Sequence, residues 1–148
     1  MRRADIGGRR MKSAAIPEDL QREHSAMLQI LHAACCAVIE GELAGARARL
    51  DALGDLQARH IRYEEQVLLP RLPPHPRWTA AVYLAEHRKL ESLLQRIRAQ
   101  WRMLPPRLDD PAQRLAALDA LHPLRHVLEH HFEREEQALF GETREGSP

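Results

Sequence analysis

Residues that favour β-sheet are scarce in this sequence of 148 residues. Valine and isoleucine together occur ten times, against 22 leucines and 21 alanines, and aromatic residues make up only 4% of the chain. Leucine and alanine favour helices, whereas β-branched and aromatic residues favour strands. The balance therefore indicates an all-α protein.

Cysteine, net charge and long apolar runs are scarce as well. The two cysteines, Cys35 and Cys36, are adjacent, so on a helix they point about 100° apart and do not readily form a disulfide with each other. We therefore expect a reducing compartment, the cytoplasm. The net charge of +1 gives no sign of a nucleic-acid partner. No apolar run follows the basic N-terminal residues, so we expect neither a signal peptide nor a membrane anchor.

The length of the chain suits one domain that buries a core of its own. We expect this domain to span residues 17–141. A basic tail at residues 1–16 and a short tail at residues 142–148 are expected to be disordered.

Four amphipathic segments, separated by proline or glycine, fill the expected domain. The first opens at Pro17 and ends before Gly41, and Pro70 stops the second. The fourth opens at Asp110, which suits a helix N-cap, and contains Pro123, where we expect a kink or a break. Four helices joined by short loops predict an up-down-up-down four-helix bundle.

One stretch of eleven residues occurs twice in the chain. Residues 60–70 read HIRYEEQVLLP and residues 131–141 read HFEREEQALFG, with five identical positions. Each copy contains His-x-x-x-Glu-Glu, which places the histidine and the first glutamate one turn apart on the same helix face. A Glu-His pair opens each half of the domain, at residues 23–24 and 86–87.

Several polar residues fall inside the apolar stripes of these helices. They are His24, His60, Glu64, His87, Glu91, His131 and Glu135. A buried carboxylate without a partner costs several kcal/mol or becomes protonated. Imidazole and carboxylate together form a ligand set for iron, zinc, manganese or copper. We therefore predict a metal site in the core; the alternative, a chance cluster of core histidines, leaves the carboxylates uncompensated.

Three further glutamates and five further histidines have other predicted positions relative to the metal site. Glu91, one turn after His87, is interpreted either as a further ligand or as the partner that holds a histidine tautomer. Glu65 and Glu136 point off the core face, so we expect them to face solvent and to pair with arginines. The remaining histidines are left out of the site: His32, His75, His122, His126 and His130.

The sequence resembles the hemerythrin-like, or HHE cation-binding, family over about residues 17–141. The resemblance is carried by Glu23-His24, His60-x-x-x-Glu64-Glu65, Glu86-His87 and His131-x-x-x-Glu135-Glu136. It implies an oxo- or hydroxo-bridged pair of iron ions inside a four-helix bundle, and the ligand set also suits zinc or manganese. The implied terminal ligands are His24, His60, His87 and His131, with Glu64 and Glu135 as bridges.

The resemblance also bears on function. Respiratory oxygen carriers of the family use His-x-x-x-His on the third helix and His-x-x-x-x-Asp on the fourth. Here residues 87–91 read His-x-x-x-Glu and residues 131–135 read His-x-x-x-Glu, which argues against simple reversible oxygen carriage. The pattern is similar to that of bacterial and sensory relatives, which implies a protein that meets O2, NO or peroxide at the iron pair, in sensing, storage or the response to iron and redox stress.

Two alternatives belong to other classes. Ferritin-like bundles need Glu-x-x-His, and no glutamate of this chain has a histidine three residues later. A helical interaction bundle with a structural or degenerate zinc site is the second alternative. No nucleotide-binding loop or nucleophile triad is visible, so we expect no conventional hydrolase or transferase; an enzyme of this design would be an oxidoreductase.

Overall fold

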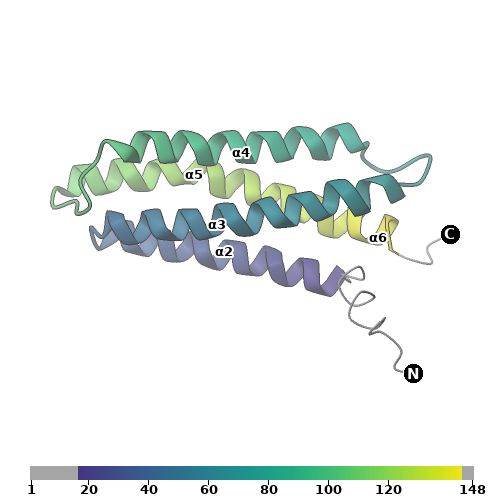
Figure 1. Cartoon of the computed structure of the whole chain (residues 1–148), viewed down its shortest axis with the longest axis horizontal. Helices are drawn as coiled ribbons and strands as arrows, with labels where there is room; N and C mark the ends of the chain where they lie inside the picture. The colour runs from purple at the N-terminus through teal and green to yellow at the C-terminus, as the bar shows by residue number, and fades with distance from the viewer. Residues whose placement is uncertain (1–16, 145–148) are drawn as a thin grey trace, which may run out of the picture.

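The structure, a computed structural model, describes residues 17–144 (Figure 1). The predicted tail at residues 1–16 and the last four residues, 145–148, lie outside the described residues. Four long helices run alongside one another: α2 (Pro17–Ile39), α3 (Leu43–Tyr63), α4 (Ala80–Arg102) and α5 (Pro111–Arg134). Within the described part of the chain there is no strand, and the predicted all-α four-helix bundle is confirmed.

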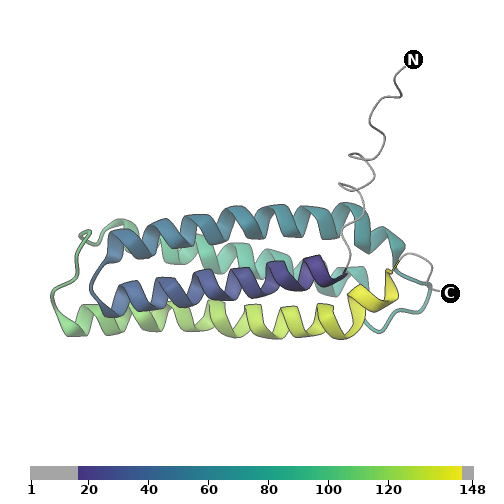
Figure 2. The ribbon, with the colours of Figure 1, turned by 90° about the horizontal axis from the view of Figure 1, so that it is seen from below.

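Each long helix packs against two neighbours. α2 and α4 each contact α3 and α5, so the order around the bundle follows the order along the chain. Because successive helices are antiparallel, α2 and α4 begin where α3 and α5 end, as Figure 2 shows. We call this the terminal end of the bundle, and the opposite end, with the α2–α3 and α4–α5 connections, the turn end. None of the described helices is long and apolar enough to cross a membrane.

Both copies of the repeated motif leave the α-helical pattern at the same point. α3 continues into the π-helical η1 (Glu64–Leu68) and the 3-10 turn η2 (Leu69–Arg71). α5 continues into the π-helical η3 (Glu135–Leu139) and the short α6 (Phe140–Glu142). Each π-helical segment begins at the first glutamate of the motif, and such segments are frequent at functional sites. From the sequence we expected ordinary α-helix in both segments.

The start of α5 agrees with prediction, and of the kink or break expected at Pro123 the break does not occur. The side chain of Asp110 accepts a hydrogen bond from the backbone N of Ala112 at 3.0 Å, and Pro111 follows the cap. α5 runs without interruption through Pro123. Pro123 and Asp119, whose carbonyl loses its usual donor, are both exposed, so water can satisfy that carbonyl.

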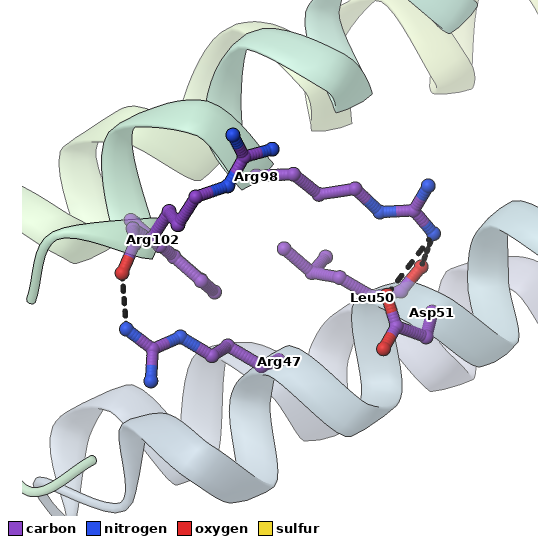
Figure 3. A pocket seen from close by; sticks show the side chains of 6 residues that line it. Arg47, Leu50, Asp51, Arg98 and Arg102 are labelled. Atoms are coloured by element: carbon purple, nitrogen blue, oxygen red, sulfur yellow. Dashed lines mark hydrogen bonds and ion pairs between the residues drawn. The ribbon is translucent and has the colours of Figure 1, made fainter. Parts of the chain in front are cut away.

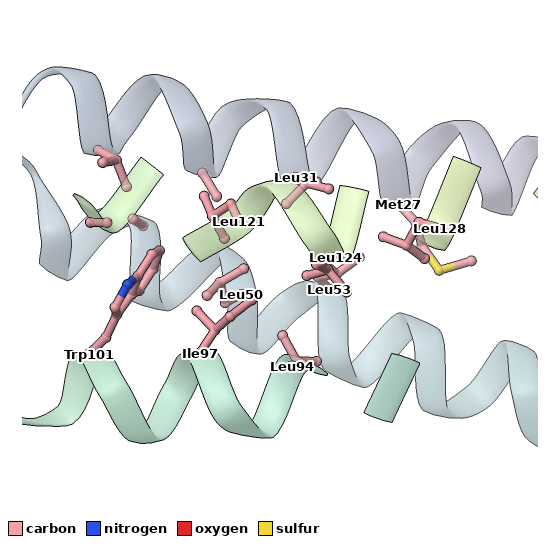
Figure 4. Packing of buried hydrophobic residues seen from close by; sticks show 14 of the residues in the cluster. Met27, Leu31, Leu50, Leu53, Leu94, Ile97, Trp101, Leu121, Leu124 and Leu128 are labelled. Carbon is pink, nitrogen blue, oxygen red and sulfur yellow. The ribbon is translucent and has the colours of Figure 1, made fainter. Parts of the chain in front are cut away.

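Apolar side chains fill the bundle on either side of a polar layer. The larger cluster reaches from Met27 and Leu128 to Trp101 at the turn end (Figure 4). A smaller cluster closes the terminal end and consists of Leu20, Leu68, Leu69, Tyr83, Leu139 and Phe140. Along the chain each site histidine lies between residues of the two clusters, as His24 does between Leu20 and Met27. After His60 and His131 the residues of the smaller cluster lie in the segments that continue α3 and α5. The polar layer is therefore walled by apolar groups along the bundle axis.

The turn end is fixed by backbone hydrogen bonds between its two connections. Gly41 has a φ of +80°, and its carbonyl accepts from the backbone N of Leu108 at 2.9 Å. The backbone N of Ala44 donates to the carbonyl of Pro106 at 2.9 Å. A Cβ at Gly41 would lie 2.5 Å from the carbonyl oxygen of Leu108, so this close approach requires glycine.

The packed chain extends beyond residue 141. Thr143 is buried, and its hydroxyl donates to the carbonyl of Leu139 at 2.6 Å. Glu142 accepts a hydrogen bond from the backbone N of Arg77 at 3.0 Å. Residues that we assigned to the C-terminal tail thus belong to the fold, because their side chains close the terminal end.

Candidate metal centre

The structure brings the six predicted ligands together in the polar layer. Six different elements supply them: His24 from α2, His60 from α3, Glu64 from η1, His87 from α4, His131 from α5 and Glu135 from η3. None of the six is more than 2% exposed. They form two groups that could each hold a metal ion. We call His24 with His60 the first half-site and His87 with His131 the second; the two glutamates belong to both.

Each buried glutamate lies between the two half-sites. One oxygen of Glu64 is 3.2 Å from Nε2 of His60, and the other is 3.1 Å from Nε2 of His87. Glu135 repeats this arrangement with the other histidine of each half-site, at 2.9 Å in both contacts. Each half-site therefore faces two imidazole nitrogens and two carboxylate oxygens, and both carboxylates are placed to bridge.

A second set of carboxylates holds the outer nitrogen of every site histidine. The pairs are Glu23 with His60 at 3.1 Å, Glu65 with His87 at 2.7 Å, Glu86 with His131 at 2.8 Å and Glu136 with His24 at 3.1 Å, each through Nδ1. In each pair the glutamate lies on the helix before that of the histidine, and the last pair returns from η3 to α2. These four glutamates, which we call the carboxylate ring, therefore encircle the bundle.

The ring corrects our expectation for two of its members. Glu65 and Glu136 lie off the core face with 37% and 36% of their side chains exposed, as expected, but they pair with His87 and His24 instead of arginines. A residue next to a core position lies about 100° around the helix, which points it at the seam with the next helix. The signal was present in the sequence, because every ring glutamate is adjacent to a residue of the predicted site.

The structure also corrects the interpretation of Glu91. Its side chain is exposed and makes no hydrogen bond or ion pair within residues 17–144, so it is neither a ligand nor a partner of a histidine tautomer. On α4 the core position after His87 is taken by Leu90, three residues later, whereas on α3 the residue four after His60, Glu64, is the buried one. The five histidines left out of the site are all exposed, as expected: His32, His75, His122, His126 and His130.

The ring determines where the site histidines carry their protons. A carboxylate accepts hydrogen bonds, so each Nδ1 bears the proton and each Nε2 presents a lone pair to the centre. Both oxygens of Glu64 and the Nε2 of His131 lack a well-aligned hydrogen bond within the described structure. The centre is therefore rich in acceptors and poor in donors, which is the environment that a cation requires.

Without a metal ion, protons supply the positive charge. Burial disfavours a charged imidazole, but hydrogen bonds to Glu135 and other carboxylates outweigh it and raise the pKa of His60 to about 12. The same balance raises the pKa of His87 to about 10 and that of His131 to about 9. Burial, followed by the charge of Glu135, raises the pKa of Glu64.

Glu135 behaves differently from Glu64. Burial opposes its charge, but the positive charge of His131 and hydrogen bonds from several histidines hold the pKa of Glu135 well below its usual range. The two carboxylates therefore differ in the metal-free protein: the pKa of Glu135 is lowered and that of Glu64 is raised.

Aromatic rings shield the first half-site from water. The ring of Phe132 stacks on His24 with centroids 3.9 Å apart and planes 9° apart. Phe140 lies on the terminal side, with its centroid 5.2 Å from that of His24. These contacts fix the imidazole and keep the local dielectric low, which strengthens its interaction with any charge at the centre.

Comparison of the chain with protein-family models, with curated proteins and with solved structures finds no match. The resemblance to hemerythrin-like proteins therefore stays a prediction that rests on the motif residues. The capacity to hold a metal ion rests on the buried histidines and glutamates described above.

Proposed function

We propose that this protein binds two metal ions side by side in the core of the bundle, with iron as the preferred metal. The carboxylate ring is the observation that carries this proposal. It points four histidine lone pairs at a space already occupied by two buried carboxylates. Only a cation or protons can compensate such a set of acceptors.

The donor set fits a pair of ions better than one. Glu64 and Glu135 each extend one oxygen toward either half-site, so each half-site offers two nitrogens and two oxygens. With neutral histidines, the two bridging and four ring carboxylates carry a formal charge of −6, which two dications reduce to −2. The ring carboxylates orient the imidazoles and increase their basicity, as outer partners of metal-binding histidines do.

We further propose that the centre meets O2, NO or peroxide, in sensing, storage or a response to iron and redox stress. Mixed imidazole and carboxylate donors suit iron, and four protein donors per ion leave positions open on a six-coordinate metal. Bound iron would supply the redox chemistry, while the apolar clusters on both sides exclude bulk water and polar solutes. The motif resemblance to hemerythrin-like proteins supports the same assignment. Cys35 and Cys36 are free thiols, which suits a cytoplasmic location.

A structural zinc centre is the second candidate. Four protein donors per half-site equal the number that a closed, tetrahedral zinc site uses. Zinc would stabilise the bundle without redox chemistry, and the protein would then act as a helical scaffold for a partner.

Spectroscopy of protein made in iron-replete cells separates the two candidates. We expect about two irons per chain and near-ultraviolet absorption that changes when the protein is reduced and then exposed to O2 or NO. The variant His131→Ala should lose at least one iron, whereas His130→Ala, one position away and exposed, should keep both. A colourless protein that holds zinc after iron-rich growth would support the scaffold instead, and loss of metal from His130→Ala alone would contradict the site.

A further inference from the structure

A cavity with charged and apolar walls lies near the turn end of the bundle, away from the metal centre. Its volume is about 360 Å³, and its walls are Arg47, Leu50 and Asp51 of α3 with Arg98, Trp101 and Arg102 of α4 (Figure 3). Asp51 precedes His60 by nine residues, or about 13 Å of helix. We propose that this cavity binds a small organic anion, a carboxylate or phosphate carried on an apolar body.

Positive charge in the walls exceeds negative charge. Three guanidinium groups face one carboxylate, that of Asp51, whose side chain is 71% exposed. Nη2 of Arg98 lies 3.3 Å from Oδ1 of Asp51 and also donates to the carbonyl of Leu50 at 3.2 Å. Among the wall residues two positive charges therefore stay uncompensated, which favours an anionic ligand.

The guanidinium groups have different tasks. Arg47 donates to the carbonyls of Trp101 and Leu104, so it occupies acceptors at the C-terminal end of α4. Arg47 thereby compensates the negative end of the α4 dipole, which would otherwise repel an anionic ligand. Within residues 17–144, the side chain of Arg102 makes no hydrogen bond or ion pair, and it is exposed at the rim. Arg102 is therefore available to bind an incoming anion.

Two further donors lie buried without a partner. They are Nε1 of Trp101, whose side chain is only 2% exposed, and Nε of Arg98. An unpaired buried donor is unfavourable, and a small movement of either side chain toward the acceptor oxygens of a ligand would relieve the cost. Leu50 and the indole of Trp101 add apolar surface, and the volume suits a small molecule. Acceptor oxygens on an apolar body are thus the complementary chemistry.

The backbone of α3 makes room for one of these arginines. A Cβ at Gly54 would lie 2.5 Å from Nη2 of Arg98 and 3.1 Å from the Leu94 side chain. Glycine is unfavourable inside a helix, and here its missing side chain lets Arg98 lie across α3. The position of Arg98 therefore depends on both helices, as expected for a formed site rather than for a mobile surface side chain.

The two tryptophans allow a direct test on the intact protein. We would titrate phenyl phosphate into the 15N-labelled chain and follow both indole N–H signals by NMR. The signal of Trp101 should shift and saturate, with a dissociation constant on the order of millimolar or tighter. Trp78 packs at the terminal end, far from the cavity, so its signal should not shift. Inorganic phosphate should bind more weakly, and phenol, which lacks the charge, should leave Trp101 unshifted.

Variants show whether the arginines are responsible. Arg102→Ala removes an exposed side chain and Gly54→Ala displaces Arg98, so each should weaken binding by about tenfold or more. Arg96→Ala removes the same charge from an exposed position of α4 outside the cavity and should bind as the wild type does. Equal affinity in Arg102→Ala and Arg96→Ala would overturn the proposal. So would a Trp101 shift that appears with DNA or anionic vesicles but not with phenyl phosphate.

Discussion

The Nε2 atoms of His24 and His60 lie 3.0 Å apart in the core of the bundle. Each ring already donates from Nδ1 to a carboxylate, His24 to Glu136 and His60 to Glu23. Two lone pairs facing each other at this distance repel unless a proton or a metal ion lies between the rings and the neighbouring carboxylates. The contact between His24 and His60 therefore requires a proton or a metal ion at the centre.

The carboxylate ring should control metal affinity through the histidines. Glu65→Gln removes the charge that holds His87, and we expect metal affinity to fall about 10- to 100-fold. Glu91→Gln, on the exposed side of the same region, is the matched control and should bind as the wild type does. Competition with a chromophoric chelator measures both. If the two variants retain the same affinity, the ring does not orient the ligands.

The metal-free protein should lose stability as the pH rises above neutrality. The pKa values of His87 and His131 are raised from 6.5 to about 10 and about 9, so the folded chain holds protons that the unfolded chain releases. Their stabilisation is complete below pH 6.5 and is lost as the pH rises through those values. The raised pKa of Glu64 acts in the same direction. Thermal melts in chelator should therefore show a falling Tm between about pH 6.5 and 9.

Metal-loaded protein should show the opposite trend over the same range. The ligands bind in their deprotonated forms, so metal affinity rises with pH and adds to the stability of the fold. The difference in Tm between loaded and metal-free protein should widen from about pH 6.5 to 9. A constant difference would mean that metal and protons do not compete for these residues.

The two buried carboxylates should respond differently to substitution in the metal-free protein. Glu135→Gln removes the charge that compensates His131 and its neighbours, and should cost on the order of 3 kcal/mol of stability near neutral pH. Glu64→Gln should leave the stability near neutral pH almost unchanged, because Glu64 has a raised pKa and accepts no well-aligned hydrogen bond. Both variants should bind little metal. Denaturant unfolding in chelator measures the contrast, and equal losses of stability would refute it.

Replacement of Gly41 by alanine should destabilise the protein more than the same replacement of Gly141. Gly41→Ala places a methyl group 2.5 Å from the Leu108 carbonyl at a φ of +80°, and should lower stability by more than about 1 kcal/mol. Nothing lies within 4 Å of the methyl group in Gly141→Ala, so this control should melt near the wild type. A Gly41→Ala protein as stable as the control would show that the turn end relaxes without cost.

The parts of this structure that follow helical periodicity could be predicted from the sequence. His24, His60, His87 and His131 recur in phase with buried leucines, so their convergence needed only the bundle and its register. The ring could not be inferred from the same rule, because its members lie off the core face and act across the seams between helices. Their partners depend on which helices are adjacent, which one-helix patterns do not give.

The π-helical segments show a second limit. An α-helical wheel places Glu64 correctly but does not signal the wider turn that begins there, since no proline or glycine marks it. Its equal occurrence at Glu135 shows that the repeated motif carries a backbone feature as well as ligands. The prediction for Glu91 was wrong because a spacing of four residues does not fix which side of the histidine faces the core. On α4 the core face runs through Leu90, three residues after His87, and this leaves Glu91 exposed.

Anaerobic titration of the metal-free protein with ferrous iron tests the central claim most directly. Tryptophan fluorescence or calorimetry would follow binding, with His131→Ala and His130→Ala titrated beside the wild type. The account predicts an end point at two ions per chain for the wild type and His130→Ala, and at one or none for His131→Ala. An end point at a single ion in the wild type, or no binding at all, would contradict a two-metal centre built on bridging Glu64 and Glu135.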